Sequence, residues 1–344
     1  MTARPPILLT GVAGFIGSQV ARHLLARGER VVGIDSLSDY GGRAIKEDRL
    51  ASLDHLAAKG ALTFHQVDIA DGAAVTAAAA GLAGCTIIHL AAQAGVRHSL
   101  SHPESYVQSN LVGFGHILEL ARTLGAAHLV FASSSSVYGA NTSMPYATTD
   151  AVGHPVSLYA ATKRANELMA HSYAHLYGLP CTGLRFFTVY GPWGRTDMAP
   201  HLFTRAILAG DPIQVFNRGR SRRDFTYIDD IVSGVVAVAD RPAAPDPRWN
   251  PDAPHPGRSH APYRLYNIGN NSPVELMTFI ATLEELLGRK ATMELLPPQP
   301  GDVPATCAEI AELESEFGFR PATPLREGLR RYVEWYRGYF GPRG

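Results

Sequence analysis

The sequence lacks several features that would place it in well-defined classes of proteins. Its 344 residues include only three cysteines, Cys85, Cys181 and Cys307, which lie far apart and form no C-x-x-C pair. This spacing predicts neither a disulfide framework nor a zinc site, and it favours a reducing cytoplasm. We therefore expect free thiols and no bound metal.

Long apolar runs and an excess of one charge are also missing. No run approaches the roughly 20 residues that cross a bilayer, and residues 1–6 hold no apolar stretch of a signal peptide. Lysine plus arginine and aspartate plus glutamate both count 31, so no net field favours nucleic acid or an anionic membrane. We expect a soluble, unprocessed protein that holds any anionic ligand at a local site.

The sequence does contain an alternation of short apolar runs with stretches of helical length. Apolar strands separated by helices are typical of a parallel sheet covered on both faces. The predicted fold class is therefore α/β, with a doubly wound Rossmann sheet. Helices are expected at 101–123, where Ser101 and Glu104 form a capping-box pattern, and at 158–177. Strands are predicted at 7–10, 30–35, 62–67, 85–89 and 128–133.

The alternation fades in the second half of the chain, where glycine and proline become frequent. Seven prolines within 241–262 interrupt any helix or strand, so we expect a surface loop there. We predict a first domain over 1–190, to which a segment at roughly 225–270 returns. Residues 191–344 would mainly form a smaller α/β lobe that binds the substrate.

A glycine-rich turn follows the first predicted strand. Gly11, Gly14 and Gly17 have the spacing G-x-x-G-x-x-G and lead into an amphipathic helix. Glycines let the backbone of such a turn approach a pyrophosphate, whose charge then lies at the N-terminus of the helix. Asp35 ends the second strand, where a carboxylate can accept both ribose hydroxyls of an adenosine, which favours NAD over NADP. A helix N-cap is the alternative role of Asp35.

The predicted cofactor is therefore NAD, and further contacts follow from position along the chain. Phe15 and Ile16 lie within the glycine turn and would contact the dinucleotide with it. Asp68 and Ile69 end the third predicted strand, where the adenine ring of the cofactor would lie.

A tyrosine and a lysine stand together in the helix predicted at 158–177. Tyr159 and Lys163 are four residues apart, so they share one face of that helix. A nearby ammonium group would lower the pKa of the phenol from about 10 and make tyrosinate a usable base. Upstream, the serine run 133–136 ends the fifth strand, where a hydroxyl can hydrogen-bond the substrate oxygen that Tyr159 deprotonates.

In their order along the chain, these motifs resemble the extended short-chain dehydrogenases/reductases, the NAD-dependent epimerase/dehydratase family. The resemblance covers nearly the whole chain, and parts of it are similar to UDP-glucuronate 4-epimerases. It rests on the glycine turn and on residues 89–92, 133–139, 159–163 and 223–229, with the narrower similarity at 133–141, 155–163, 184–195, 266–276 and 299–303.

The resemblance implies a role for individual residues. Ser134 would be the catalytic hydroxyl beside Tyr159 and Lys163, while Ser135 and Ser136 would face the sugar or its carboxylate. Tyr159 and Lys163 would also contact NAD, together with Leu90, Ala91, Ala92, Gln93, Asn110 and Phe187. The UDP-sugar would be held by Thr188, Arg195, Phe216, Arg223, Gln299 and Asp302.

The chain departs from the relatives that epimerise neutral UDP-glucose. Those relatives carry Asn in place of Thr188 and Arg in place of Gln299, so the polar wall near the sugar and pyrophosphate differs. Arg195 and Arg223 remain to hold anionic groups, because guanidinium matches carboxylate and phosphate oxygens in pairs; surface solvation is their alternative role. Cys307 replaces a tyrosine common in the family, which changes the detail of the same wall.

The resemblance implies an epimerisation at C4 of a nucleotide sugar. Tyr159 would take the proton of the 4-hydroxyl while hydride passes to NAD and returns to the other face of a transient 4-keto sugar. UDP-glucuronate and UDP-galacturonate would thus interconvert.

Alternative functions share most of these motifs. A UDP-glucuronate decarboxylase or a UDP-glucose 4-epimerase would carry the same turn and catalytic groups. A 4,6-dehydratase would need an acid pair where this chain has Ser135 and Ser136. A catalytically silent NAD-binding regulator is the alternative from another class. The resemblance also implies a homodimer that forms through the helices starting near Ser101 and Ser157.

Overall fold

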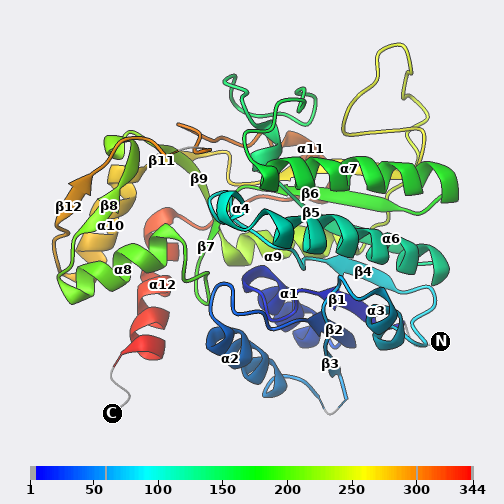
Figure 1. The fold of residues 1–344 in the computed structure, drawn as a ribbon, viewed down its shortest axis with the longest axis horizontal. Coiled ribbons are helices and arrows are strands. Elements are labelled where there is room, and N and C mark those ends of the chain that lie inside the picture. Colours follow the sequence, from blue (N-terminus) through cyan, green and yellow to red (C-terminus); the bar gives the residue numbers. More distant parts are fainter. Residues whose placement is uncertain (1–4, 59, 300, 342–344) are drawn as a thin grey trace.

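The main element of the fold is a seven-stranded sheet whose paired strands are all parallel (Figure 1). The computed structural model describes residues 5–58, 60–299 and 301–341. The α/β class is confirmed, and the five predicted strands lie within one residue of the observed ones. In sheet order the strands are β10 (Tyr263–Ile268), β6 (Cys181–Phe186), β5 (His128–Ser134), β4 (Thr86–His89), β1 (Ile7–Thr10), β2 (Val31–Asp35) and β3 (Leu62–Gln66).

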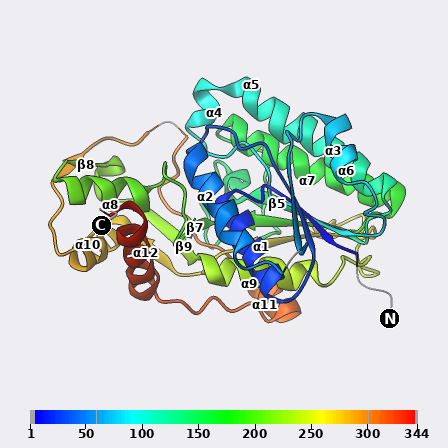
Figure 2. The same cartoon turned by 90° about the horizontal axis from the view of Figure 1, so that it is seen from below.

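Helices cover both faces of this sheet (Figure 2). One face carries α3 (Gly72–Ala78), α6 (Gly113–Thr123) and α7 (Leu158–Tyr177). The other carries α1 (Phe15–Ala26), α9 (Ile228–Ala239) and α11 (Ala311–Phe317), with α2 (Arg43–Asp54) packed beside α1. Every residue of β1 and β6 is buried, as expected for strands covered on both sides. Within the described residues, no helix combines the length and apolar character that a membrane span requires.

The helix predicted at 101–123 is divided into four pieces. These are α4 (His98–Ser101), α5 (Pro103–Tyr106), a π-helix (Val107–Val112) and α6. The predicted capping box is wrong, because the Ser101 hydroxyl closes α4 by donating to the His98 carbonyl at 3.3 Å. In the π-helix, the Asn110 carbonyl accepts instead from Asn166 Nδ2 on α7 at 2.6 Å. The helix predicted at 158–177 agrees with α7.

The second half of the chain leaves the large sheet and later rejoins it. A smaller lobe lies at the left of Figure 1 and contains a three-stranded sheet, β11-β9-β7, and a two-stranded sheet, β12-β8. Between the parts of this lobe, α9 packs on α1 and β10 pairs with β6. The lobe comprises β7 (Thr188–Tyr190), α8 (Ala199–Ala209), β8 (Ile213–Val215), β9 (Arg222–Tyr227), β11 (Pro273–Glu275), α10 (Leu276–Leu287), β12 (Met293–Leu295) and α12 (Leu325–Phe340).

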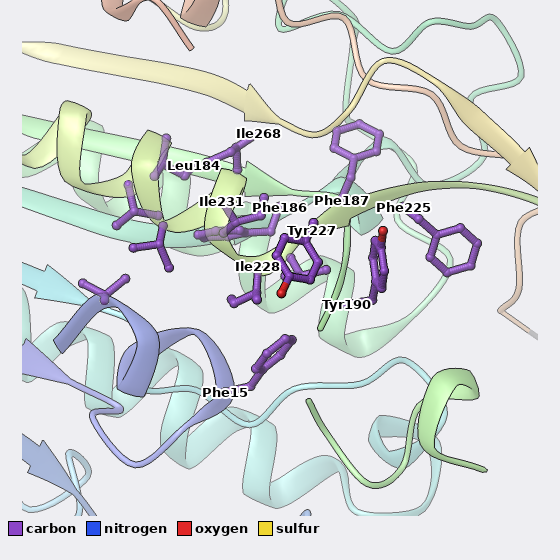
Figure 3. Close-up of a cluster of buried hydrophobic side chains, with 14 of the residues drawn as sticks. Phe15, Leu184, Phe186, Phe187, Tyr190, Phe225, Tyr227, Ile228, Ile231 and Ile268 are labelled. Carbon is purple, nitrogen blue, oxygen red and sulfur yellow. The ribbon is translucent and has the colours of Figure 1, made fainter. Parts of the chain in front are cut away.

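A buried apolar cluster joins the start of α1 to the segments after β6 (Figure 3). Phe15 points toward Tyr227 and Ile228, while Phe187 and Tyr190 continue the cluster toward the smaller lobe. Burial of one such side chain contributes about 1.5–3 kcal/mol, so the cluster holds the glycine turn and β7 in a fixed relation.

Candidate active site

A cleft of about 650 Å³ lies at the carboxyl ends of the parallel strands. This volume is within the range of small-molecule sites, and the position is where open α/β sheets bind their ligands. The residues around the cleft come from the segments that follow β1 to β6. Predicted residues that border it are Gly11, Gly14, Phe15, Ile16, Gly17, Asp35, Asp68, Ile69, Leu90, Ala91, Ala92, Gln93, Ser134, Ser135, Ser136, Tyr159, Lys163, Phe187, Thr188 and Arg195.

The glycine turn forms a close-packed cradle at one side of the cleft. Gly11 has a φ of +73°, and a Cβ there would lie 2.7 Å from the Ala91 nitrogen. A Cβ on Gly17 would lie 2.0 Å from the Gly11 carbonyl oxygen, so only glycine fits at either position. Helix α1 follows directly, and its first turn carries no acidic side chain. Its positive end is therefore suited to the pyrophosphate of a dinucleotide.

Asp35 lies at the end of the cleft where β2 stops. Its carboxylate accepts from the Ala13 N–H at 3.1 Å and from the Leu37 N–H at 2.9 Å. The alternative role as a helix cap is excluded, because α2 begins at Arg43 and Gly42 stands at its N-cap position. Each oxygen keeps a free lone pair for a ribose hydroxyl.

Tyr159 borders the cleft from the first turn of α7. Ser157 caps this helix by accepting from the Ala160 N–H at 3.1 Å, which fixes where α7 begins. Burial raises the pKa of Tyr159, whereas a hydrogen bond with Ser134 and the charge of Arg195 lower it. Among the predicted serines, Ser134 is thus the one in contact with the phenol. Its hydroxyl also bonds Ser136 Oγ at 3.1 Å.

Lys163 borders the same cleft as Tyr159 and shares its face of α7. Its ammonium donates to the Ala132 carbonyl on β5 at 2.9 Å, and burial lowers its pKa to about 8. The side chain thus reaches from α7 to the strand β5. Its remaining N–H groups border the cleft and are suited to cofactor hydroxyls.

Arg195 enters the cleft from the segment after β7. Its guanidinium pairs with both oxygens of Asp197, at 3.0 and 2.6 Å, and donates to the Tyr40 hydroxyl at 2.9 Å. Burial alone would lower the pKa of Arg195, but Asp197 holds it above its ordinary value. Surface solvation is therefore not its role. No local pattern in the sequence indicates Tyr40 or Asp197, which contact Arg195 only in the fold.

Asn110 does not border the cleft, in contrast to the predicted contact with NAD. Its side chain accepts from the Gln93 N–H at 2.8 Å and donates to the Gln93 carbonyl at 3.0 Å. It also donates to the Thr162 hydroxyl at 3.1 Å. The amide is buried beneath the loop after β4, so it positions Gln93, which does border the cleft.

Four predicted substrate residues, Phe216, Arg223, Gln299 and Asp302, lie outside the cleft lining. Three of them gather around Arg97, a residue that sequence reasoning missed. Arg97 pairs with Asp302 at 2.9 Å and lies over the Phe216 ring, 4.7 Å from its centroid. Burial lowers the pKa of Arg223, whereas the charge of Asp302 raises it. Gln299 is joined to this group through its carbonyl, which accepts from the Asp302 N–H at 3.2 Å.

Within the described residues, no three His, Cys, Asp or Glu side chains lie in a group that could hold a metal ion. The polar groups of the cleft include hydroxyls, the carboxylates of Asp35 and Asp68, and buried cations, which match a dinucleotide and an anionic sugar nucleotide.

Comparison with known proteins places these features in a family. The profile of the NAD dependent epimerase/dehydratase family matches residues 7–269. A probable UDP-glucuronate 4-epimerase of Rhizobium meliloti is 49% identical over 330 residues, which cover 96% of both chains. UDP-glucuronate 4-epimerase 2 of Arabidopsis thaliana is 43% identical over 339 residues, which cover 97% of this chain and 76% of the relative.

The fold is similar to solved structures over the same length. A UDP-glucuronic acid 4-epimerase from Bacillus cereus, in complex with UDP-glucuronic acid and NAD, aligns with a TM-score of 0.83 and 30% identity. The alignment covers 97% of this chain and 99% of that one. The matched family profile spans the glycine turn, Ser134, Tyr159, Lys163 and β10. The chain therefore belongs to the NAD dependent epimerase/dehydratase family.

Proposed function

We propose that this protein is a UDP-glucuronate 4-epimerase, which interconverts UDP-glucuronate and UDP-galacturonate with bound NAD. The observation that carries the proposal is the contact between Ser134 and Tyr159 in the cleft that begins at the glycine turn. The similarity to UDP-glucuronate 4-epimerases over nearly the whole chain supports this substrate. Residues 1–190, with 225–270, would bind NAD, and residues 191–344 would mainly bind the sugar nucleotide.

The cleft residues divide into groups that would hold different parts of NAD. The glycine turn and the N-terminus of α1 would hold the pyrophosphate, and Asp35 would hold the adenosine ribose. Lys163 would donate to hydroxyls near the nicotinamide from its position beside Ala132. When bound, NAD supplies a hydride acceptor that becomes the hydride donor in the second half of the reaction.

Tyr159 would act as the base that takes the proton of the sugar 4-hydroxyl and later returns it. Ser134 bonds its phenol and so stabilises the tyrosinate form, because a hydrogen bond to the charged form lowers a pKa. The cation of Arg195 acts in the same direction. These two groups therefore offset part of the burial that raises the pKa of Tyr159.

The purified protein should convert UDP-glucuronate into UDP-galacturonate and reach the same mixture from either side. No net oxidation is expected, because each turnover regenerates NAD. Chromatography that separates UDP-galacturonate, UDP-glucuronate and UDP-pentose measures the outcome. UDP-pentose as the main product would show a decarboxylase instead, and an unchanged substrate would reject the proposed activity.

A clamp on the substrate carboxylate would separate epimerisation from decarboxylation. The 4-keto form of a uronic acid is a β-keto acid, which loses carbon dioxide when the carboxylate bond aligns with the carbonyl π system. Thr188, at the start of β7, borders the same cleft as Ser135 and Ser136. We propose that these hydroxyls hold the carboxylate away from that alignment.

The change Thr188→Val should remove one clamp hydroxyl at almost constant side-chain volume. We expect a weaker affinity for UDP-glucuronate, by about tenfold, and the appearance of UDP-pentose among the products. Thr282→Val, on an exposed part of α10, is the matched control and should behave as the wild type. A Thr188→Val protein with normal KM and no UDP-pentose would exclude the clamp.

The proposed assembly is a homodimer in the cytoplasm. Helix α7 exposes Leu168 and Leu176, and the neighbouring π-helix exposes Val107 and Val112. Apolar residues on two adjacent helices are suited to packing against the same pair in a second copy. The free thiols of Cys85 and Cys181 support a reducing compartment.

A further inference from the structure

Arg49 is a buried arginine whose role neither the sequence motifs nor the proposed chemistry explains. It projects from α2, is 3% exposed and borders the cleft. Its guanidinium donates to backbone carbonyls, and burial lowers its pKa to about 10, so it stays a cation at neutral pH. A buried cation that donates to carbonyl oxygens is costly to retain unless it fixes a specific arrangement.

The carbonyls that Arg49 contacts belong to two separate segments. Nη1 donates to the Ala13 carbonyl in the glycine turn at 3.1 Å. Nε and Nη2 donate to the Trp193 carbonyl at 3.1 and 2.6 Å, and Nη2 also contacts the Gly194 carbonyl at 3.3 Å. One planar side chain thus joins the cofactor cradle to the segment after β7.

The glycine turn depends on this contact for its orientation at Ala13. The Ala13 N–H donates to Asp35, and the Ala13 carbonyl accepts from Arg49. This residue is therefore fixed between a carboxylate and a guanidinium. The turn around it bears the glycines that would face the pyrophosphate.

The segment 191–195 depends on Arg49 in the same way. Trp193 has a φ of +64°, which a non-glycine residue adopts only when its surroundings enforce it. Its ring packs on Trp335 and Tyr339 of α12, and Tyr339 bonds Asp48, the neighbour of Arg49. The segment ends at Arg195, whose guanidinium lies in the cleft near Tyr159.

We propose that Arg49 is a positioning residue that couples cofactor binding to substrate binding by fixing the glycine turn and segment 191–195 to each other. The role follows from geometry, since a guanidinium can donate in two directions at once while keeping its plane rigid. When a ligand orders one of these two segments, the side chain of Arg49 orders the other as well. This inference rests on the proposed function for the identity of the second ligand.

The coupling predicts a thermodynamic link between NAD and a uridine nucleotide. UDP is a suitable probe because it occupies the nucleotide part of the substrate site and cannot react. The dissociation constant of NAD is measured by calorimetry on protein freed of nucleotide, with and without saturating UDP. The ratio of these two dissociation constants measures the coupling. Thermodynamic reciprocity requires that the dissociation constant of UDP change by the same factor when NAD is present.

Two variants of Arg49 and one control test the proposal. Arg49→Met removes every donor of the side chain and should weaken NAD binding by about tenfold or more. In this variant the ratio of the NAD dissociation constants without and with UDP should fall to about one. Arg49→Lys keeps the positive charge, but its three N–H donors lie on one nitrogen and cannot reach both segments, so it should restore part of the NAD affinity without the coupling. Arg43→Met removes an exposed guanidinium of the same helix, paired with Glu47, and should match the wild type.

The outcomes separate this inference from the proposed function. The inference is wrong if Arg49→Met protein unfolds like the wild type in urea and still binds NAD normally. It is also wrong if both Arg49 variants keep the wild-type coupling ratio. If Arg49→Met fails to fold, the Arg49→Lys ratio decides by the same criterion. Wild-type protein that binds NAD but not UDP would reject the proposed substrate class, while NAD affinity in the variants would still decide the role of Arg49.

Discussion

Tyr159→Phe protein should lose nearly all epimerase activity while it keeps its fold and both ligands. The change removes one oxygen, and with it the only group that the proposed mechanism uses to take the 4-hydroxyl proton. General base catalysis contributes about 10²–10⁴-fold to a rate, so kcat should fall by that factor. The dissociation constants of NAD and UDP should change little, because the aromatic ring still fills its position.

Tyr173→Phe is the matched control on the same helix. Its hydroxyl bonds Glu119, away from the cleft, so turnover should stay near that of the wild type. In the wild type, kcat should rise with pH, because burial raises the pKa of Tyr159 and only its deprotonated form takes a proton. Near-normal turnover of the Tyr159→Phe protein would show that Tyr159 is not the base.

The parts of the site that the sequence predicted are those with a local cause. The glycine turn, Asp35 and Ser134 each follow a short apolar strand, and the carboxyl ends of parallel strands meet at one edge of a sheet. Tyr159 follows a helix cap, so its place on α7 could be predicted from the 3.6-residue period. Short-range patterns therefore located the cleft and one of its walls.

The parts that the sequence did not predict depend on contacts between distant residues. Arg49 and Trp193 are 144 positions apart, and no local pattern shows that they meet. The spacing of Tyr159 and Lys163 predicts a shared helix face, but the partner of the Lys163 ammonium depends on where the Ala132 carbonyl lies. Asn110 stands in a π-helix, whose wider turn an α-helical period does not describe.

The substrate lobe illustrates the same limit. The resemblance predicts Phe216 and Asp302 as two separate substrate contacts. In the structure both contact Arg97, which lies in the loop after β4. Such a group depends on the way two lobes pack, which composition and periodicity do not determine. The family resemblance supplied the individual residues, and the structure supplied their common partner.

A buried ion pair lies one helical turn beyond Lys163 and fixes α7 to the sheet. Glu167 accepts from Arg185 Nε and Nη2 at 2.8 and 3.0 Å, and both side chains are fully buried. The Ser133 hydroxyl donates to the same carboxylate at 2.6 Å, and Arg164 donates to it at 2.9 Å. Since Ser133 precedes Ser134, the pair also aligns the end of β5 with the helix that carries Tyr159.

Glu167→Gln should lower the free energy of unfolding by about 3–5 kcal/mol, because it leaves the Arg185 cation buried without a counter-charge. That is a large part of the 5–15 kcal/mol typical of a folded protein. Burial alone would raise the pKa of Glu167, but Arg185 and Ser133 hold it below its ordinary value. The stabilisation is therefore complete above the carboxyl pKa of the unfolded chain, about 4.3, and is lost as the pH falls through the lower folded value.

Urea unfolding followed by circular dichroism measures this loss at neutral pH and again in acid, where the two proteins should converge. Glu47→Gln is the matched control, since Glu47 pairs with Arg43 on the exposed side of α2 and its loss should leave the urea midpoint unchanged. Replacing both partners, as Glu167→Gln with Arg185→Met, should recover part of the stability, because no unpaired charge then remains in the core. A Glu167→Gln midpoint equal to that of the control would show that α7 is held by apolar packing alone.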